Sequence, residues 1–214
     1  MNKADRSRHY QDRVRKAIAK PRLQDTLHRF ADAYVIAREA AFAGQDFEAL
    51  RTAIGEMKDE VRDNMPRYRD QFIANAEAAG AKVYIARTAA EANTYICNLA
   101  KQRGVKTVVK SKSMASEETH LNHALKDAGV EALETDLGEW IIQLAGERPS
   151  HMVMPAMRMR KEEVAGRFSK VTGDEEPAEI LRLVRLARGQ LRLADLDADM
   201  GITGANVAIA ETGG

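Results

Sequence analysis

The feature that most constrains the fold of this chain is an alternation of short apolar runs with longer helical stretches, which begins near residue 80. Strands that alternate with helices of about 10–15 residues form βαβ units, whose strands lie parallel in one sheet. We therefore expect an α/β fold with a mostly parallel sheet flanked by helices. The expected strands are residues 82–86, 105–110, 130–135, 151–155 and 201–212.

Helix start and stop signals lie between these expected strands. Thr88 and Glu91 form a capping-box pattern that begins a helix, and Gly104 ends it. Ser113 can cap a second helix, which Gly129 ends. Two charged helices are expected at residues 160–170 and 177–194.

The region before residue 80 has a helical pattern, with apolar residues three to four positions apart. Gly44 separates two such stretches, Pro66 opens a third and Gly80 ends it. We expect a helical region at 1–79 and an α/β domain at 80–214. The last expected strand runs almost to the end of the chain, which predicts an incomplete, truncated domain with an exposed sheet edge.

Composition excludes several classes of protein. A net charge of +1 gives no field that would attract nucleic acid. No apolar run approaches the roughly 20 residues of a membrane span, and the charged N-terminus is no secretory signal. The single cysteine, Cys97, allows no internal disulfide and cannot hold an iron–sulfur cluster, which normally takes four thiolates. We expect a cytoplasmic protein with no metal in this chain.

The segment from Lys110 to Ser113, with the sequence Lys-Ser-Lys-Ser, is the strongest candidate for a ligand site. It lies between an expected strand and an expected helix, where ligands bind in open α/β sheets. Two lysines, two hydroxyls and the free N–H groups of the helix would favour an anion. The alternative is a solvated turn in which Ser113 only caps the helix.

Other polar residues could contribute chemistry at the ends of later strands. Carboxylates at the end of the third expected strand could bind metal or act as acid and base, although Asp136 could simply cap a helix. His151 could titrate near neutrality, but a structural role is the alternative. His120 and His123, with Glu117, have a loose metal-ligand spacing and lack a further ligand. The remaining candidates are Glu134, Glu139, Thr203, Gly204 and Glu211.

Three long segments together resemble the LUD domain family, in particular the iron–sulfur subunits of bacterial L-lactate utilisation. They are VVKSKSMASEETHLNHALKDAG, ETDLGEWIIQLAGERPSHMVMPA and DADMGITGANVAIAETG. Their order and spacing match the family from about residue 20 to residue 214. The resemblance implies a fold like the NagB/RpiA/CoA-transferase class and a role in oxidising L-lactate to pyruvate with two other subunits.

The resemblance also implies 4Fe-4S clusters in the complete subunit, which would pass electrons from lactate towards the respiratory chain. Here the chain departs from the family pattern, because it ends in ETGG where the family continues into further strands and cysteine motifs. We therefore expect no cluster and no independent redox activity in this chain. We also expect the parental gene to continue with C-x-x-C-x-x-C motifs.

Motif positions transfer to this chain as a predicted site. Lys110, Ser111, Lys112 and Ser113 would contact a small carboxylate or phosphate. The other residues of the predicted site would line the same cleft: Glu134, Asp136, Glu139, Thr203, Gly204 and Glu211. The two ammonium groups repel unless an anion lies between them or Glu134 and Asp136 neutralise them. Both lysines are expected to be exposed, so that replacing them should change folding little.

Two other functions are alternatives to this one. One is an isomerase or CoA transferase of the same superfamily, in which Glu211 would be the nucleophile or base. The other is an assembly module without a ligand site, which would dock a cluster domain onto partner subunits.

Overall fold

The computed structural model describes residues 3–19, 21–147 and 154–214. The chain divides into two compact units, Met1–Met65 and Pro66–Gly214. The second unit therefore includes one helix, α4 (Met65–Ala78), in addition to the α/β region expected at 80–214. Each unit is described by itself.

The first unit consists of helices, as the apolar spacing predicts. Asp46 caps α3 by accepting a hydrogen bond at Oδ1 from the Ala49 N–H, 2.9 Å away. Gly44 has φ +78° in the turn before that cap, a conformation that favours glycine. The rings of Phe42 and Phe47 pack edge to face across the turn, with centroids 4.8 Å apart. The helices are α1 (Lys3–Ile18), α2 (Pro21–Ala41) and α3 (Phe47–Asp63).

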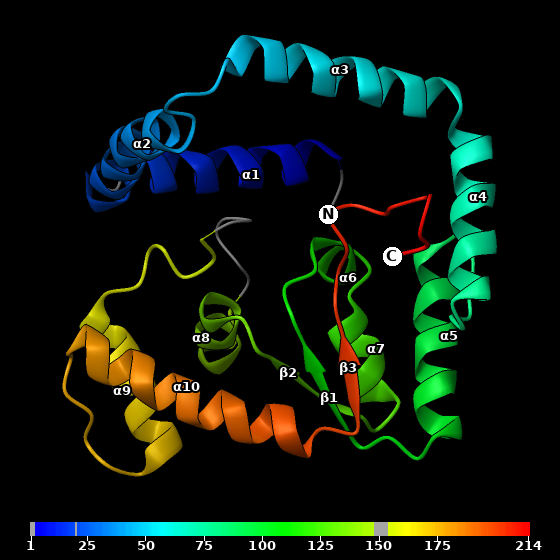
Figure 1. Cartoon of the computed structure of the whole chain (residues 1–214). Helices are drawn as coiled ribbons and strands as arrows, with labels where there is room; N and C mark the ends of the chain where they lie inside the picture. Colours follow the sequence, from blue (N-terminus) through cyan, green and yellow to red (C-terminus); the bar gives the residue numbers. More distant parts are fainter. Residues whose placement is uncertain (1–2, 20, 148–153) are drawn as a thin grey trace. The chain divides into compact units, whose positions relative to one another are not determined.

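The second unit is an α/β domain built on a parallel sheet, which confirms the predicted fold class (Figure 1). The strands β1 (Thr107–Lys110), β2 (Glu131–Glu134) and β3 (Met200–Ile202) lie in the order β2-β1-β3, and both pairings are parallel. Besides α4, its helices are α5 (Ala89–Gln102), α6 (Met114–Glu118), α7 (Leu121–Asp127), α8 (Leu137–Ala145), α9 (Lys161–Thr172) and α10 (Ile180–Asp197).

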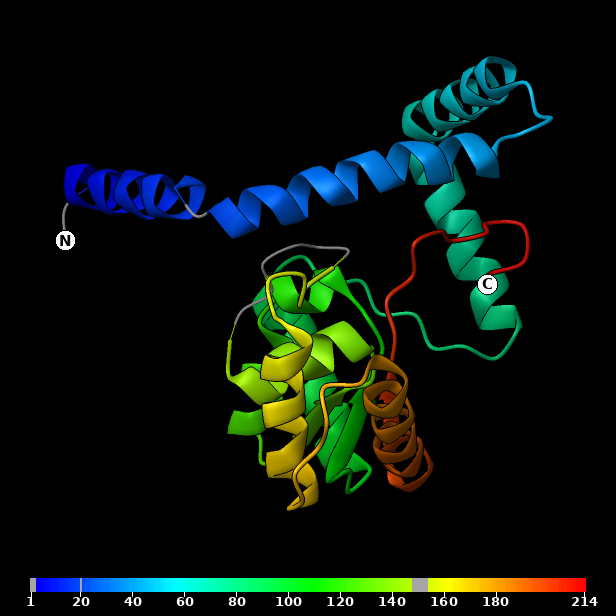
Figure 2. The ribbon, with the colours of Figure 1, turned by 90° about the vertical axis from the view of Figure 1, so that its left-hand side faces the viewer.

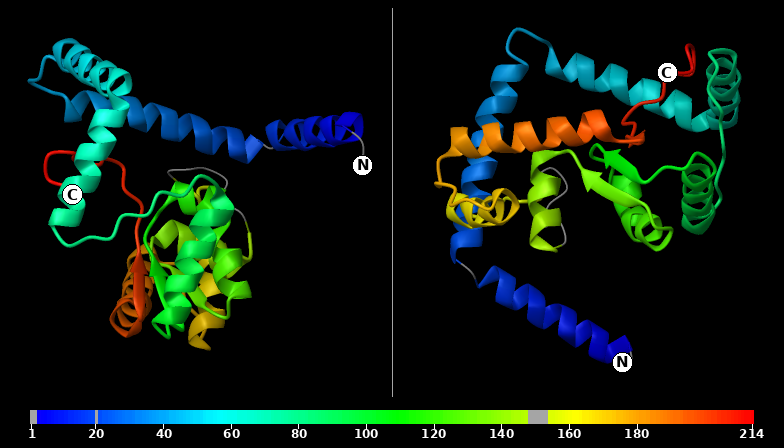
Figure 3. Two further views of the ribbon diagram at one scale, coloured as in Figure 1. Left: turned by 90° about the vertical axis from the view of Figure 1, so that its right-hand side faces the viewer. Right: turned by 90° about the horizontal axis from the view of Figure 1, so that it is seen from below.

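Helices cover both faces of this sheet, and each face has its own apolar core. On one face, α5 and α7 pack against β1 through residues such as Ala100, Leu125 and Val108. On the other face, Trp140 of α8 and Phe168 of α9 meet with ring centroids 5.0 Å apart, and α10 packs beside them. The view from below in Figure 3 shows α5 on one side of the strands and α8 and α10 on the other.

Two of the expected strands differ from the structure: one is absent, and the other is shorter than expected. Residues 82–86 form no strand, and Tyr84 and Ile85 there are exposed. The expected strand at 201–212 is confined to Met200–Ile202, so the idea of an apolar strand running to the end of the chain is wrong. A β-type run becomes a strand only where a neighbouring strand accepts and donates its backbone hydrogen bonds. Most of the fourth expected strand, at 151–155, lies outside the described residues.

The segment after β3 leaves the sheet and binds α4 instead of extending the strand (Figure 2). The side-chain amide of Asn75 donates to the carbonyl oxygens of Ala210 and Glu211 at 2.8 and 3.0 Å. Gly213, with φ +77°, lies so close to α4 that an added Cβ would come within 2.2 Å of the Ala76 nitrogen. The last turn of the chain therefore packs backbone to backbone against α4, which only glycine permits.

The helix expected at residues 113–129 is broken in two. His120 adopts the left-handed conformation, with φ 56°, between α6 and α7. The Asn93 side chain holds this break by donating to the Thr119 carbonyl at 2.7 Å. The expected stops elsewhere are confirmed, since Gly104 and Gly129 both follow helix ends with positive φ.

One edge of the sheet is closed by a side chain. The amide of Gln143, on α8, accepts from the Glu134 N–H at 3.0 Å and donates to the Ala132 carbonyl at 2.7 Å. These two groups flank Leu133 on the outward side of β2, where a further parallel strand would bond. Gln143 thus replaces a strand at this edge. The other edge, β3, borders a hollow of about 920 Å³ that α5 helps to line.

We predict that Gln143→Leu lowers the free energy of unfolding by about 1–3 kcal/mol, because it leaves one partly buried donor and one partly buried acceptor of β2 unsatisfied. Urea denaturation measures the change. Gln190→Leu on the exposed surface of α10 is the matched control and should change stability little. Equal effects of the two substitutions would contradict the edge role of Gln143.

Candidate functional site

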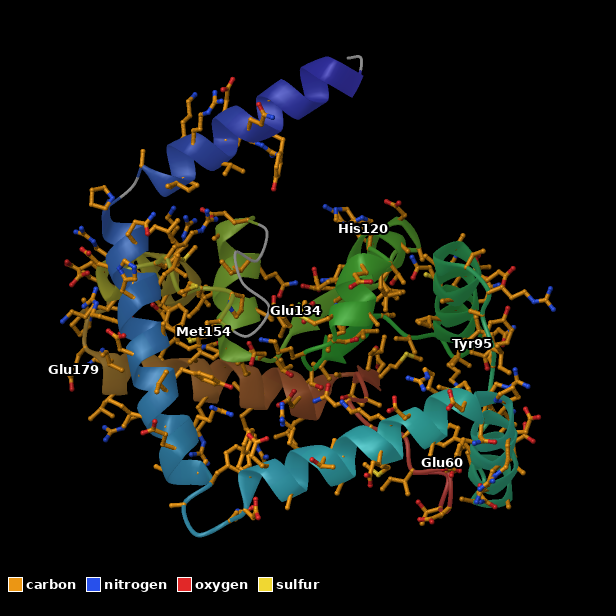
Figure 4. All side chains as sticks on the ribbon, turned by 90° about the horizontal axis from the view of Figure 1, so that it is seen from above. Glu60, Tyr95, His120, Glu134, Met154 and Glu179 are labelled. Carbon is orange, nitrogen blue, oxygen red and sulfur yellow. The ribbon has the colours of Figure 1, made fainter. Side chains whose placement is uncertain are left out.

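The register of the sheet brings Lys110 and Glu134 together at its carboxyl edge. The two residues are direct neighbours in the β1–β2 pairing. Because side chains alternate between the faces of a strand, Lys110 shares the face of buried Val108, against α7. Glu134 points to the same face of β2. Figure 4 shows Glu134 in the interior between α8 and α7.

Lys110 is fully buried, and its ammonium group is hydrogen-bonded to neighbouring side chains. Its Nζ donates to Oε1 of Glu134 and to Oδ1 of Asn122, both at 2.7 Å, and Oε1 of Glu117 lies 3.6 Å away. Asn122 also donates to Glu134 Oε1 at 2.8 Å. We call the residues Lys110, Glu117, Asn122, Glu134 and Glu139 the carboxyl-edge cluster. The expectation that Lys110 is exposed is wrong, because its ammonium group is the buried partner of Glu134.

The loop after β1 is joined to the loop after β3. Ser111 Oγ donates to Thr203 Oγ1 at 2.8 Å, and the Ser111 N–H donates to the Ile202 carbonyl at 2.9 Å. Gly204 lies against Ser113, since an added Cβ would meet the Ser113 Cβ and Oγ at 3.0 Å. Four of the predicted site residues, Ser111, Ser113, Thr203 and Gly204, are thus brought together at the carboxyl edge.

Ser113 and Asp136 both cap helices, which was the alternative to a ligand role for each residue. Ser113 accepts at Oγ from the Ser116 N–H, 3.2 Å away, and so caps α6. Asp136 accepts at Oδ1 from the Glu139 N–H, 3.1 Å away, and so caps α8. A ligand role for either residue would be additional to its cap.

Glu139, in the first turn of α8, differs from the other carboxylates of the site. It is only 5% exposed, and its Oε1 is buried without a hydrogen-bond partner among the described residues. Burial raises the pKa of this carboxyl most, and the negative charge of Glu117 raises it further. Glu134 and Asp136 act in the same direction, whereas Lys112 opposes them. The fold therefore favours the protonated form of Glu139.

The charges at this edge do not form a simple cationic pocket. Lys110 and Lys112 face four carboxyl groups, those of Glu117, Glu134, Asp136 and Glu139. Lys110 is bound to Glu134, whereas Lys112 acts electrostatically on Glu139.

Glu211 lies apart from this cluster. The tail that carries it is bound to Asn75 of α4, and Glu211 itself is exposed. Within the described part of the chain, no hydrogen bond or ion pair joins Glu211 to the carboxyl-edge cluster. The structure thus does not bring Glu211 together with the other predicted site residues.

Neither His120 nor His123 belongs to a metal-binding group of the described residues. The His120 and His123 rings pack edge to face, 6.0 Å between centroids, while the Glu117 carboxylate lies near Lys110. Among residues 3–19, 21–147 and 154–214, no group of three or more His, Cys, Asp or Glu side chains is placed to hold a metal ion. His151 lies outside the described residues.

Sequence reasoning missed two amides that organise the site, Asn122 and Gln143. Their signal is weak, because each is one polar residue next to apolar ones on a helix that packs on the sheet. The spacing of Leu121 and Leu125 marks the buried face of α7, and Asn122 adjoins that face. A polar residue beside a buried stripe could have been paired with the buried lysine only after the strand register was known.

The geometry defines a parallel α/β domain with a polar cluster at the carboxyl edge of its sheet. A profile of the LUD domain matches residues 69–214, more than half of the chain. The chain therefore belongs to the LUD domain family.

Curated relatives agree with this assignment. The chain is 42% identical over 168 residues to "Lactate utilization protein B" of Oceanobacillus iheyensis, covering 78% of this chain and 35% of that protein. It is 38% identical over 206 residues to the protein of the same name from Lysinibacillus sphaericus, covering 95% of this chain and 43% of that protein. The Shouchella clausii protein of that name is 42% identical over 169 residues, 78% of this chain and 36% of its own length.

The chain thus spans between 35% and 43% of the length of these relatives. No solved structure matches it. The likeness to the NagB/RpiA/CoA-transferase class therefore stays a prediction. None of the described helices combines the length and the apolar character that crossing a membrane requires.

We predict that Lys110→Met lowers the free energy of unfolding by about 3–5 kcal/mol, because it leaves the Glu134 carboxylate buried without its partner. The double variant Lys110→Met/Glu134→Leu should regain much of this loss, since it removes both charges. Chemical denaturation measures all variants. Lys126→Met, at an exposed position of α7, is the control. A Lys110 variant as stable as the control would show that the pair contributes little.

We also predict a pH effect on stability from Glu139. The fold raises the pKa of this carboxyl, so its protonated form contributes stability that is fully present below the ordinary pKa of glutamate. That stability is lost as pH rises through the raised pKa and the carboxyl ionises. Glu139→Gln removes this loss and should gain stability over the wild type as pH increases. Thermal unfolding at a series of pH values tests it, with exposed Glu131→Gln as the control. A stability difference that does not change with pH would contradict the raised pKa.

Proposed function

We propose that this chain is the LUD portion of an iron–sulfur subunit that takes part in bacterial oxidation of L-lactate to pyruvate. The observation that carries the proposal is the match to relatives named "Lactate utilization protein B", one of which aligns with 95% of the chain. In this proposal, the domain binds a small 2-hydroxy or 2-oxo carboxylate at the carboxyl edge of its sheet.

The position and chemistry of that edge support a carboxylate ligand. Ligands of open α/β sheets bind beyond the carboxyl ends of the strands. The Ser111–Ser113 loop supplies hydroxyl groups there, and Thr203 adds another from the end of β3. Lys112 lies in the same loop and adds a positive charge that would attract the ligand carboxylate.

An iron–sulfur cluster does not fit the residues of this chain. A cluster normally requires four thiolates, whereas the only cysteine, Cys97, is buried in the core between α5 and the sheet. Burial also raises the pKa of its thiol and so disfavours the thiolate that binds iron. In the proposal, 4Fe-4S clusters belong to other parts of the complete subunit, which works in the cytoplasm with the two other lactate utilisation subunits.

Two other functions compete with this proposal. An isomerase or CoA transferase based on Glu211 lacks support, because Glu211 is placed beside α4. An assembly module is favoured by one observation, the exposed apolar residues Leu50, Ile54 and Met57, which share one face of α3. Exposed apolar patches often mark contact surfaces between proteins.

Calorimetric titration with L-lactate, pyruvate and phosphate separates the ligand site from the assembly module. We predict that Lys112→Ala weakens carboxylate binding by about 1–3 kcal/mol, the range for a lost hydrogen bond to a charged group. Lys126→Ala should bind like the wild type. If neither carboxylate binds the wild type, or if Lys112→Ala binds both unchanged, the assembly module becomes the better account.

A further inference from the structure

The apolar face of α3 is exposed in the first unit. Its apolar residues recur at intervals of three and four positions and so lie on one side of the helix: Phe47, Leu50, Ile54, Met57 and Val61. No residue of α3 is buried, and the Met57 side chain is 58% exposed. A helix of this kind gains most of its stability by burying its apolar face, so α3 needs a neighbour.

A matching face of α2 is exposed as well. Ala33, Ile36 and Ala40 recur at the same intervals, and the Ile36 side chain is 69% exposed. The two alanines leave room for larger side chains of a facing helix. The two helices diverge after the turn that joins them, so neither face covers the other (Figure 1).

Charged residues border the two faces in rows of opposite sign. Asp32 and Glu39 form an acidic row along α2, and Arg51 and Lys58 form a basic row along α3. Among the described residues, Asp32, Glu39 and Lys58 form no ion pair. Arg51 is paired with Glu48 at 2.6 Å, in an exposed contact on its own helix that contributes little to stability. The two rows are therefore available to pair with each other.

The positions of the rows determine the direction in which the helices can pair. Each acidic residue directly precedes an apolar residue of the α2 face, whereas each basic residue directly follows one of the α3 face. In a parallel pair of helices, the preceding side of one face meets the following side of the other, so the two rows meet. In an antiparallel pair the two preceding sides meet, and the acidic row would then face Asp46 and Glu60. Charge therefore favours the parallel pair.

One copy of the chain cannot form this parallel pair by itself. Only residues 42–46 join α2 to α3, and helices joined by so short a turn are neighbours only when they run antiparallel. The start of α3 is also held at the end of α2, because the Arg38 guanidinium lies 4.4 Å from the centre of the Phe47 ring. The matching face must come from a second molecule.

We propose that α2 and α3 form a dimer interface, in which α3 of one copy packs parallel to α2 of a second copy. In this register Ile36 lies against Leu50 of the second copy, and Ala40 lies against Ile54. A two-fold axis produces each contact twice, because both copies supply one α2 and one α3.

The same register brings the charged rows together. Asp32 meets Arg51 of the second copy, and Glu39 meets Lys58. The interface does not depend on the carboxylate site of the proposed function, so Lys112→Ala should dimerise like the wild type.

Sedimentation equilibrium of the purified chain measures the dimer directly. The wild type should have twice the chain mass of 23.7 kDa. Glu39→Lys and Lys58→Glu should each weaken the dimer at least about tenfold, because each turns two attractive ion pairs into repulsive ones. Glu56→Lys, an exposed charge reversal on the opposite side of α3, is the matched control and should leave the affinity unchanged. Circular dichroism verifies that each variant keeps its helices.

Mixing the two weakened variants separates a second copy from a contact within one chain. In a mixed dimer, the introduced lysine of Glu39→Lys faces the introduced glutamate of Lys58→Glu. The unchanged Glu39 of one copy likewise faces the unchanged Lys58 of the other. The mixture should therefore dimerise with an affinity close to that of the wild type, although neither variant does so alone.

Three results would overturn the proposal. The first is a wild type that stays monomeric at high concentration. In that case, nuclear Overhauser contacts between Ile36 and α3 would assign the face to its own chain, and their absence would leave it to a different protein. The second is a dimer whose affinity neither variant changes, and the third is a mixture that stays monomeric. Either of these would place the interface elsewhere on the chain.

Discussion

The ion pair between Lys110 and Glu134 is the constraint on which the carboxyl edge of this domain depends. A buried ammonium group is tolerable only with a partner close by, and the β1–β2 register provides one at 2.7 Å. Asn122 satisfies both members of the pair, which ties α7 to the sheet. The same ammonium group lies 3.6 Å from a carboxylate oxygen of Glu117. One structural pair therefore organises the charged groups around it.

The closing of the β2 edge belongs to the same arrangement. Gln143 binds the outward backbone groups of Ala132 and Glu134, so α8 is fixed against β2. The N-terminal turn of α8 carries Glu139, whose N–H is held by the Asp136 cap. The position of Glu139 is thus determined by hydrogen bonds at both ends of a short helix. Such support from outside a site is what holds functional groups in place.

The sequence was sufficient to predict the α/β class, the parallel sheet, and the caps at Thr88, Ser113 and Asp136, because these depend on local patterns. It could not predict that residues 82–86 lack a strand partner, since pairing is a long-range property. The burial of Lys110 was missed for the same reason, because it depends on the pairing of β1 with β2. Without that pairing, a lysine at the end of a strand is expected to be exposed. Likewise, the position of Glu211 beside α4 depends on Asn75, which is distant in the sequence.

The central claim is that the carboxyl edge binds a small carboxylate through the loop after β1 and the first turn of α8. The most direct test is an NMR titration of the nitrogen-15-labelled chain with pyruvate, which follows every backbone amide at once. The account predicts saturable shifts at Ser111, Lys112, Ser113 and Glu139. Shifts confined to other parts of the chain, or no shifts up to high pyruvate concentration, would contradict it.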